Sequence, residues 1–542
     1  MGRLLKGKTP RDFQVELAVS QEQQQDAICH PATGLGKTFV AAAPFALEHN
    51  VNTKRIVLIV SPLISLQEEM ICISELTTVQ VKTFEYEFNL TAIAVNSTRG
   101  GLRRDTLRQI VDGVYRVVLI SPELLLSRRF SSLVLKNSSF KSRIHSVIVD
   151  EAHCVSHWGA SFHKAYARIG SVRVLLPKYT PFVAVQATLT RRVLRDLKEK
   201  LQLTRRSDLV FLNMGNDRTN VSLAVRAIQN AINSFFDLDF TVSSDAQSAE
   251  DVPKTWIHTD NIKEGGLICD YLRSKRLREM GIDPAIIREY SAALTSEYRT
   301  SAMDQFRSGK IRILICTDAA GMGCNIPDMD IVVQWRLPQK LSSFVQRAGR
   351  AARGQGRVGL AVLLCEPFVY SIDLAALASE SEKAASRKAA RSHLIKSKAP
   401  GGHGTDDTLR EMDEPDANPE SVDEGLIHFA QTTKCRRRVL TEVFDNPPSV
   451  PTVACCDICN PELLDRTRPL PKQTNVRAPR VKKGEVQPEI VQAVKACIDD
   501  RPRPQAEVVT LGSTRARPHS GAPRRGCRGG SSPANSLTPP QW

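Results

Sequence analysis

A short hydrophobic run that ends at Val149 is followed directly by two carboxylates, Asp150 and Glu151. A run of this kind indicates a parallel strand that is buried on both faces, which restricts the chain to α/β architectures. Open α/β sheets bind their ligands at the carboxyl ends of their strands. There, one carboxylate can hold Mg²⁺ while its neighbour polarises a water molecule, although a helix cap or a solvated loop could carry the same pair.

An upstream segment, P-A-T-G-L-G-K-T at residues 31–38, has the composition of a phosphate-binding loop. Glycines allow backbone N–H groups to approach phosphate oxygens, Lys37 reaches the β- and γ-phosphates, and Thr38 offers a hydroxyl to Mg²⁺. The strict pattern begins with a glycine, and Pro31 stands at that position here. The predicted nucleotide contacts of this loop are Thr33, Gly34, Leu35, Gly36, Lys37 and Thr38.

A third group of residues, Q-R-A-G-R-A-A-R at 346–353, carries Arg350 and Arg353 three positions apart. On a helix these two arginines would share one face and could present their guanidinium groups to a γ-phosphate. A basic helix face with surface ion pairs is the alternative. Together with the phosphate loop and the carboxylates, the group predicts a nucleotide-hydrolysing motor in which Glu151 activates water and Asp150 and Thr38 hold Mg²⁺.

Alternating apolar runs and helical patterns predict two sheets. The runs are 56–60, 117–120, 147–149 and 182–185 in the first set, and 255–258, 311–316 and 331–334 in the second. This alternation predicts an α/β fold with two tandem doubly wound parallel-sheet domains. The stretch 191–254 is predicted to join them, with a loop at 243–251.

From about Phe13 to Asn460 the chain resembles the RecQ family of superfamily 2 DNA helicases. Besides the three groups above, which include the run D-E-A-H at 150–153, the resemblance rests on R-D-F-Q (11–14), S-P-L-I-S-L-Q (61–67), N-S-T (96–98), S-P-E-L (121–124), Q-A-T (186–188) and C-T-D-A-A-G-M-G-C-N-I-P-D (316–328). It implies that both domains are RecA-like, that ATP is hydrolysed, and that movement on DNA runs 3′ to 5′.

The resemblance also assigns roles to single residues. Gln14 would read adenine, Gly321 would lie in the segment that couples the ATP state to strand grip, and Ser61, Pro62, Ser97 and Thr98 would contact DNA. The implied catalytic residues are Lys37, Asp150, Glu151, His153, Gln346, Arg350 and Arg353, of which Arg350 and Arg353 also contact the nucleotide. Gln186 replaces the family's serine or threonine before A-T, and its amide still allows a hydrogen-bonded link between Thr188 and the D-E-A-H strand.

After D-E-A-H, the family has an aromatic-rich loop, which here reads C-V-S-H-W-G-A-S-F-H-K at 154–164. Trp158 and Phe162 would stack on DNA bases, a contact that contributes about 1 to 3 kcal/mol per base. Two aromatic residues four positions apart could equally pack into a core on one helix face.

The chain has 13 cysteines, and we expect most of them to be buried thiols of a protein in a reducing compartment. Cys435, Cys455, Cys456 and Cys459 differ because they cluster around a loop of suitable length for tetrahedral zinc. They resemble the RecQ zinc module, in which the second ligand would fall at Val453 and Cys455 takes its place. A three-thiolate site and free cysteines in a small helical appendage are the alternatives.

The predicted domains are 1–208, the first RecA-like, ATP-binding domain; 209–375, the second RecA-like domain; 376–434, a helical segment and flexible linker; 435–462, a small helical zinc-binding module; and 463–542, a disordered basic tail. The net charge of +16 suits a polyanionic partner. No membrane partner is expected, and the sequence does not predict protein partners. The resemblance implies a nuclear location, or the cytoplasm of a prokaryote.

The sequence therefore predicts an ATP-dependent 3′–5′ DNA helicase that uses ATP, Mg²⁺ and Zn²⁺ and acts on single-stranded and tailed or branched duplex DNA in repair or recombination. One alternative is a DNA-binding or annealing protein that does not unwind and whose nucleotide site only switches affinity. Another is an RNA helicase of the DEAH type. ATP turnover measured with DNA, with RNA and without nucleic acid distinguishes them.

Overall fold

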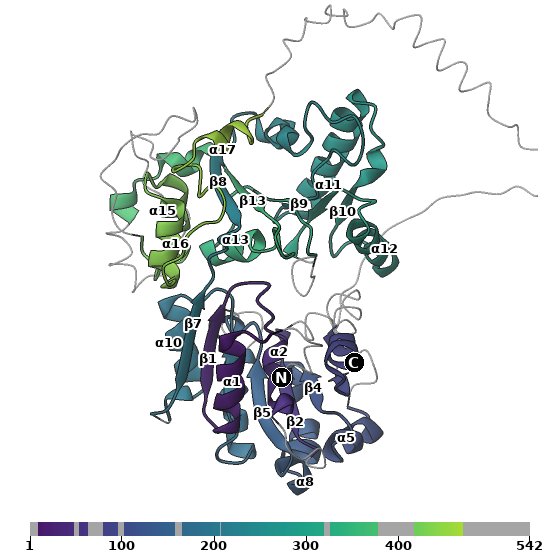
Figure 1. Ribbon diagram of the computed structural model, residues 1–542, viewed down its shortest axis with the longest axis vertical. Helices are drawn as coiled ribbons and strands as arrows, with labels where there is room; N and C mark the ends of the chain where they lie inside the picture. Colours follow the sequence, from purple (N-terminus) through teal and green to yellow (C-terminus); the bar gives the residue numbers. More distant parts are fainter. Residues whose placement is uncertain are drawn as a thin grey trace, which may run out of the picture. The chain divides into compact units, whose positions relative to one another are not determined.

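The computed structural model describes residues 9–47, 54–62, 80–95, 102–157, 165–205, 207–318, 326–377 and 417–469. These residues build two parallel sheets followed by a small helical region (Figure 1). The α/β class and the two RecA-like parallel sheets predicted from the sequence are confirmed.

The first sheet has seven strands in the order β3-β4-β2-β5-β6-β1-β7. All of its neighbouring strands pair in parallel. The strands are β1 (Ala27–Pro31), β2 (Ile56–Val60), β3 (Ala92–Val95), β4 (Val117–Ile120), β5 (Ile144–Val149), β6 (Phe182–Val185) and β7 (Val210–Gly215). Successive residues of β2 point into two different cores, since Leu58 belongs to one cluster and Val57 and Ile59 to another. Both faces of the sheet are therefore covered.

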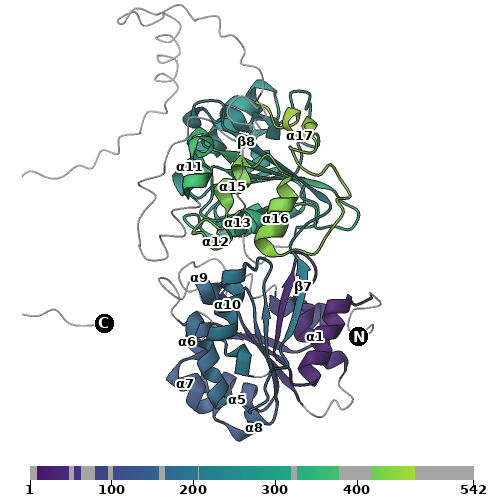
Figure 2. The ribbon, with the colours of Figure 1, turned by 90° about the vertical axis from the view of Figure 1, so that its left-hand side faces the viewer.

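Helices form the two covering layers of the first sheet. In Figure 2, α1 (Asp12–Glu22) lies on one side of the sheet, while α5 to α8 and α10 lie on the other. The helical elements are α2 (Phe39–Ala42), η1 (Ala43–Ala46), η3 (Thr83–Glu87), α5 (Arg104–Val111), α6 (Pro122–Leu125), α7 (Arg128–Phe130), η5 (Ser131–Leu135), α8 (Ser138–Lys141), α9 (Cys154–His157), η6 (Tyr166–Leu175), α10 (Arg191–Lys200) and η7 (Leu203–Arg205). Side-chain caps start several of them: Thr190 Oγ1 accepts a hydrogen bond from Val193 N at 3.3 Å and fixes the start of α10.

The second sheet has six strands in the order β10-β11-β9-β12-β13-β8. The strands are β8 (Val221–Ala227), β9 (Thr255–His258), β10 (Ile287–Tyr290), β11 (Ile313–Cys316), β12 (Ile331–Trp335) and β13 (Gly359–Cys365). The helical elements are η8 (Ile232–Ser234), η9 (Phe236–Thr241), α11 (Ile262–Tyr271), η10 (Leu272–Leu277), η11 (Pro284–Ile286), α12 (Ser296–Arg307), α13 (Leu341–Ala348) and η13 (Pro367–Ser371). This sheet is also covered on both faces, since Leu314 and Ile315 of β11 lie in different clusters.

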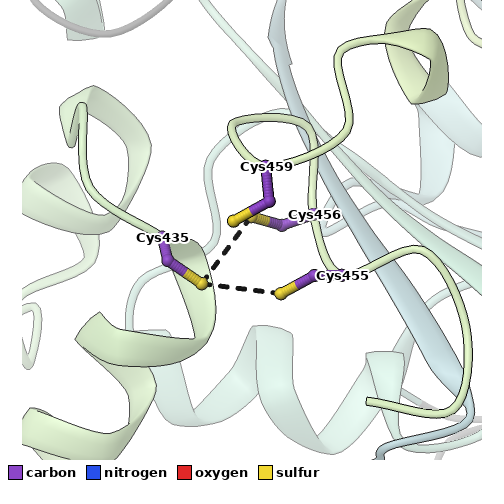
Figure 3. A group of neighbouring side chains, drawn as sticks. All are labelled: Cys435, Cys455, Cys456 and Cys459. Carbon is purple, nitrogen blue, oxygen red and sulfur yellow. Dashed lines mark hydrogen bonds between the residues drawn. The ribbon is translucent and has the colours of Figure 1, made fainter. Parts of the chain in front are cut away.

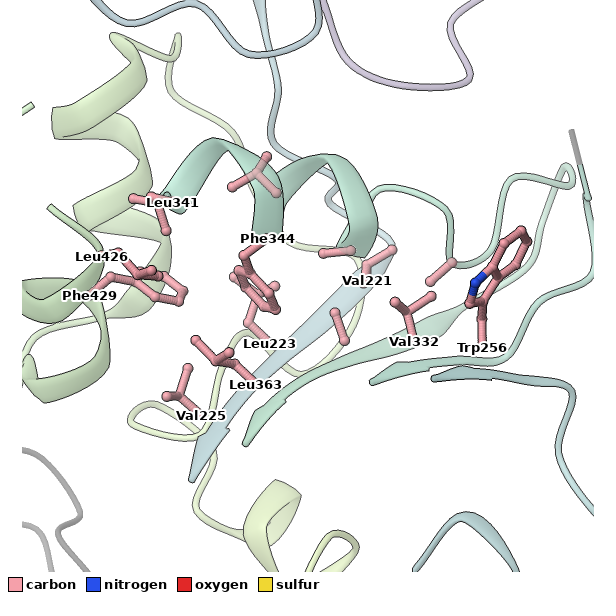
Figure 4. Packing of buried hydrophobic residues seen from close by; sticks show 14 of the residues in the cluster. Val221, Leu223, Val225, Trp256, Val332, Leu341, Phe344, Leu363, Leu426 and Phe429 are labelled. Carbon is pink, nitrogen blue, oxygen red and sulfur yellow. The ribbon is translucent and has the colours of Figure 1, made fainter. Parts of the chain in front are cut away.

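The region that follows the second sheet shares its core. It contains α15 (Leu426–Gln431), α16 (Arg436–Phe444) and α17 (Glu462–Asp465). Figure 4 shows Leu426 and Phe429 of α15 packed beside Leu341 and Phe344 of α13, and the rings of Phe344 and Phe429 lie 5.7 Å apart. We call residues 426–465 the cysteine module. It is an extension of the second domain's core.

Two predictions about boundaries are wrong. The first sheet runs to Gly215, beyond the predicted boundary at residue 208, and the stretch 191–254 supplies an edge strand to each sheet, β7 and β8. The predicted disordered tail begins too early, because Leu463 and Leu464 of α17 are buried against β8. Residues from 470 onward lie outside the described part of the chain.

Among the described residues, none of the helices is both long and apolar enough to span a lipid bilayer.

A buried ion pair fixes the cysteine module to β8. Arg436 and Asp457 are each 0% exposed. Arg436 Nε and Nη2 donate to the two oxygens of Asp457 at 3.1 and 2.8 Å, and Asp457 Oδ1 also accepts from Val225 N of β8 at 3.2 Å. Because both charges are satisfied by this geometry, removing one leaves the other buried and unpaired.

We predict that Arg436→Ala destabilises this part of the protein by about 3 to 5 kcal/mol, the usual cost of an uncompensated buried charge. Arg438→Ala is the matched control on the same helix, because Arg438 is 65% exposed and pairs with Glu442 at the surface. Urea unfolding followed by circular dichroism measures both variants. Equal unfolding midpoints for the two variants would contradict the role of the pair.

Candidate nucleotide and metal sites

The two carboxylates lie where the sequence predicts, directly after β5. Asp150 N donates to Val60 O of β2 at 2.9 Å, and Ala152 N donates to Val185 O of β6 at 3.2 Å. Glu151 has a positive φ of 46°, a conformation that residues other than glycine rarely adopt. Such a conformation persists only when the surroundings fix it, and here the neighbouring strands hold the backbone on both sides.

The electrostatic surroundings of the two carboxylates differ. Burial and the adjacent Glu151 raise the pKa of Asp150 to about 6. Burial alone would raise the pKa of Glu151 as well, but Lys37, His153 and Arg350 lower it to about 2. Glu151 is therefore ionised at neutral pH. A nearby cation would favour the ionised form of Asp150. The Asp150 carboxylate and the exposed Thr38 hydroxyl both offer oxygen atoms, which are the ligands that suit Mg²⁺.

The phosphate loop connects β1 to α2. Gly34 and Gly36 have φ values of 84° and 83°, so both use the left-handed region that glycine adopts without strain. A Cβ on Gly36 would also lie 2.9 Å from Gln14 Nε2. The loop thus requires both glycines, as expected for a backbone that bends around phosphate oxygens.

Gln14 is buried against this loop. Its Nε2 donates to Gly36 O at 3.1 Å and to Leu35 O at 3.4 Å, and its Oε1 accepts from Arg11 N at 3.0 Å. These bonds attach α1 to the phosphate loop. The adenine contact of Gln14 stays a prediction.

Residues 346–353, which we call the arginine segment, are helical only as far as Ala348. Helix α13 ends at Ala348, so Arg350 and Arg353 lie in the turn that follows, where Ala352 has a φ of 48°. The Arg350 guanidinium lies 5.7 Å from the centroid of the Trp256 ring and lowers the pKa of Glu151. Arg353 packs on the phosphate loop, with its Cγ 3.6 Å from the position of a Cβ on Gly34. The structure therefore brings both arginines to the predicted phosphate site from a loop.

A chain of polar contacts connects the carboxylates to the second sheet. His153 Nδ1 lies 3.4 Å from Glu151 Oε2 and 2.8 Å from Gln186 Oε1. Gln186 Nε2 donates to Thr188 Oγ1 at 2.9 Å, and Gln346 Nε2 donates to the same hydroxyl at 3.0 Å. Burial opposes protonation of His153, but the Cys154 sulfur and the Glu151 carboxylate raise its pKa well above the usual value. The predicted link between Thr188 and the D-E-A-H strand is present.

Arg347 was not predicted as a functional residue. It is buried, and its Nη2 lies 2.6 Å from Asp318 Oδ1 and 2.8 Å from Asp260 Oδ1, while its Nη1 donates to Gln334 Oε1 at 2.5 Å. These contacts hold the arginine segment against the ends of β9, β11 and β12. The sequence shows Asp318 and Arg347 in two separate motifs but does not show that they pair.

The predicted DNA contacts are only partly described. Ser61 is fully buried at the end of β2 and Pro62 is buried beside it, so direct DNA contacts of these two side chains are not supported. The remaining predicted residues of this kind are Ser97, Thr98, Trp158 and Phe162, and together with Gly321 they lie outside the described residues.

Four cysteines form the candidate metal site. Cys435 lies at the start of α16, and Cys455, Cys456 and Cys459 lie on one loop of the cysteine module (Figure 3). Their sulfur atoms all lie within 4.8 Å of one another, and Cys435 Sγ lies 3.5 Å from Cys455 Sγ and 4.0 Å from Cys456 Sγ. Tetrahedral zinc with Zn–S bonds of about 2.3 Å separates its sulfur ligands by about 3.8 Å. The group therefore fits zinc, and Cys455 joins the cluster in place of the expected ligand at Val453.

Burial and hydrogen bonds among the four thiols shift their pKa values. Burial raises the pKa of Cys455 to about 11, and the hydrogen bond with Cys435 together with burial raises the pKa of Cys456. The hydrogen bond from Cys456 lowers the pKa of Cys435. Because zinc binds thiolates, a bound ion would ionise these sulfurs and convert metal affinity into stability of the module.

Comparisons with known proteins agree with the nucleotide site. Residues 11–197 match the profile of the DEAD/DEAH box helicases, and residues 242–355 match the helicase conserved C-terminal domain. The probable ATP-dependent DNA helicase RecS of Bacillus subtilis is 29% identical over 364 residues, which are 66% of this chain and 64% of that protein. The mouse bifunctional 3′-5′ exonuclease/ATP-dependent helicase WRN is 27% identical over 450 residues, which are 82% of this chain and 27% of that protein.

A putative ATP-dependent RNA helicase, R290 of Acanthamoeba polyphaga mimivirus, is 28% identical over 300 residues, which are 55% of this chain and 48% of that protein. The chain thus spans at most 64% of the length of each of these three relatives.

We predict one equivalent of zinc per chain and its loss in Cys456→Ser, because a hydroxyl is a much poorer ligand for zinc than a thiolate. Zinc affinity should fall by more than the roughly 10- to 100-fold that is lost when a hydrogen-bond partner of a ligand is removed. The control is Cys269→Ser, which changes a buried cysteine of α11 outside the cluster. Elemental analysis after dialysis against a chelator measures both variants, and retention of zinc by Cys456→Ser would contradict the assignment.

Proposed function

Because this chain is a DEAD/DEAH box helicase with a helicase C-terminal domain, we propose that it is a RecQ-type, ATP-dependent 3′–5′ DNA helicase of repair or recombination. The observation that carries the proposal is the contact chain from Glu151 through His153, Gln186 and Thr188 to Gln346. It connects the hydrolytic carboxylate on one RecA-like sheet with the arginine segment on the other. A motor needs such a connection to convert hydrolysis into movement.

The geometry supports a division of work among the residues of the site. The backbone N–H groups of the phosphate loop and Lys37 bind the phosphates of ATP, and ionised Glu151 accepts the proton of the attacking water. Arg350 and Arg353 offset the charge that develops on the γ-phosphate. Asp150 and Thr38 would hold Mg²⁺, which neutralises phosphate charge when bound.

Two observations favour DNA as the nucleic acid. The relative RecS is named as a probable ATP-dependent DNA helicase. The four-cysteine cluster resembles the RecQ zinc module, with Cys455 in place of the ligand expected at Val453. The net charge of +16 suits either nucleic acid, because phosphate contacts release counterions from both. The nuclear location implied by the resemblance stays a prediction.

We expect ATP turnover to rise with single-stranded DNA more than with RNA, and duplexes with a 3′ tail to be unwound in preference to those with a 5′ tail. Glu151→Gln should lower turnover about a hundredfold or more, because the attacking water loses its general base. Glu85→Gln, on the exposed surface of η3, is the matched control. Steady-state phosphate release and a strand-separation assay measure these effects.

Three results would redirect the proposal. Hydrolysis without strand separation would favour a DNA-binding or annealing protein whose nucleotide site only switches affinity. Stimulation by RNA alone would favour an RNA helicase. An unchanged turnover in Glu151→Gln would contradict the catalytic assignment.

We predict that Gln186→Leu lowers the DNA-stimulated turnover about tenfold, the effect of losing hydrogen bonds worth about 1.4 kcal/mol in total. Leucine fills nearly the same volume but breaks the contacts with His153 and Thr188. The KM for ATP should change little, because the proposed mechanism gives Gln186 no part in holding phosphate. Gln109→Leu, at the exposed surface of α5, is the control. Equal DNA stimulation in both variants would sink the proposed link.

A further inference from the structure

The segment that joins the two sheets, residues 216–220, lies against the arginine segment. We call it the linker, and it runs from the end of β7 to the start of β8. Arg218 of the linker donates to three backbone carbonyl groups: Nη1 to Gly349 O at 2.7 Å, and Nη2 to Ala351 O at 3.1 Å and to Ala352 O at 2.8 Å. These carbonyl groups flank Arg350 and directly precede Arg353. One guanidinium thus fixes the backbone that carries both predicted γ-phosphate ligands.

The strained residue of this backbone is held by the linker. Ala352 has a φ of 48°, which is costly for a residue with a Cβ. Its carbonyl accepts from Arg218 Nη2 at 2.8 Å and from Asn220 Nδ2 at 2.9 Å, and its N–H donates to Met329 O at 2.8 Å. Because strain persists only where the surroundings impose it, Arg218 and Asn220 set the direction in which Arg353 leaves the backbone.

The same contacts reach the phosphate loop. Gly349 O accepts from Thr33 Oγ1 at 2.7 Å as well as from Arg218, and Arg218 Nη1 lies 3.4 Å from Thr33 O. Arg353 Nε also donates to Gly349 O, at 3.3 Å. A carbonyl oxygen has two lone pairs, so three donors compete for it. Arg218 and Thr33 thus hold Gly349 through bonds that do not involve Arg353.

The cysteine module holds the linker from its other side. Arg437 of α16 pairs with Asp217, and its Nη1 donates to Arg218 O at 3.2 Å. Ser449 Oγ donates to Asp217 Oδ2 at 2.5 Å, and Asn446 Nδ2 donates to Asn216 Oδ1 at 2.9 Å. The linker therefore has one side on the arginine segment and the other on the helix that begins after Cys435.

We propose that Arg218 is a positioning residue for ATP hydrolysis, which orients the backbone of Arg350 and Arg353 toward the γ-phosphate, and that Arg437 of the cysteine module holds Arg218 in place. This inference rests on the proposed function, since it assumes that Arg350 and Arg353 face the phosphate. In this proposal Arg218 acts through these two residues and not through a contact with the nucleotide.

Charge-conserving variants test the proposal. Lysine carries one donor group in place of the planar fork of arginine, so Arg218→Lys cannot hold three carbonyl groups at once. We expect its kcat for ATP to fall about tenfold to a hundredfold, with the KM for ATP within about threefold of wild type. Arg437→Lys should also lower kcat, by a smaller factor than Arg218→Lys. The control is Arg357→Lys, because Arg357 is 43% exposed and pairs with Asp330.

Two further measurements separate positioning from folding. The kinetics are measured well below the thermal unfolding midpoint of each variant, with zinc content determined on the same samples, and both variants should retain wild-type zinc. The double variant should lose less activity than the product of the two single losses, because both residues act along one path.

A wild-type kcat in Arg218→Lys would overturn the proposal. A loss of activity that only follows the unfolded fraction of the variant would also overturn it. The same holds if the loss in the double variant equals the product of the two single losses. Failure of the proposed function looks different: the wild-type protein and Arg357→Lys would then show no ATP turnover that depends on Glu151.

Discussion

The central strands of both sheets are buried on both faces, and this constraint decides where polar groups can lie. Every residue of β2, β4 and β6 is buried in the first sheet, as is every residue of β9, β11 and β12 in the second. An unpaired polar group inside such layers costs free energy, so polar groups gather at the strand ends. The phosphate loop after β1 and the carboxylates after β5 are consequences of this arrangement. The positive φ of Glu151 indicates that the sheet fixes even the backbone of the proposed general base.

Gln186 is a polar side chain inside this core, and its burial is tolerated because both ends of its amide have partners. Its Oε1 contacts His153 and its Nε2 donates to Thr188, while the residue itself is 0% exposed. The family that the sequence resembles has a shorter serine or threonine at this position. The longer side chain of Gln186 contacts both His153 and Thr188. Glutamine at this position therefore preserves the hydrogen-bonded connection between the carboxylates and Gln346.

The fold and the centre of the nucleotide site follow from local sequence, because apolar runs, glycine loops and strand-end carboxylates have short-range signatures. The cysteine cluster was predictable for the same reason, including the use of Cys455 for Val453. The end of α13 was missed because Gly349 to Ala352 makes tertiary bonds from its carbonyl groups, and helical spacing of arginines does not reveal those bonds. The edge strand β7 was missed because it is half exposed and has no continuous apolar pattern. The edge strand β8 is buried, but Ser222 and Arg226 interrupt its apolar residues. Arg218 was missed because it binds backbone carbonyl groups, which carry no side-chain signature.

The cysteine module and the second sheet form one core, and this makes a metal ion in the module relevant to the ATP site. Leu223 of β8 pairs with Cys456, and β8 begins where the linker ends. Arg437, Asn446 and Ser449 hold the linker through an ion pair and hydrogen bonds. All three residues lie between Cys435 and Cys455, the first and second cysteines of the cluster. The free energy of metal binding in such a cluster contributes to the stability of the segment between its ligands. An ion bound there would therefore stabilise the segment that carries Arg437, Asn446 and Ser449. Arg218 and Asn220 of the linker donate hydrogen bonds to the backbone of the arginine segment. A continuous set of contacts therefore runs from the candidate metal site to the candidate nucleotide site.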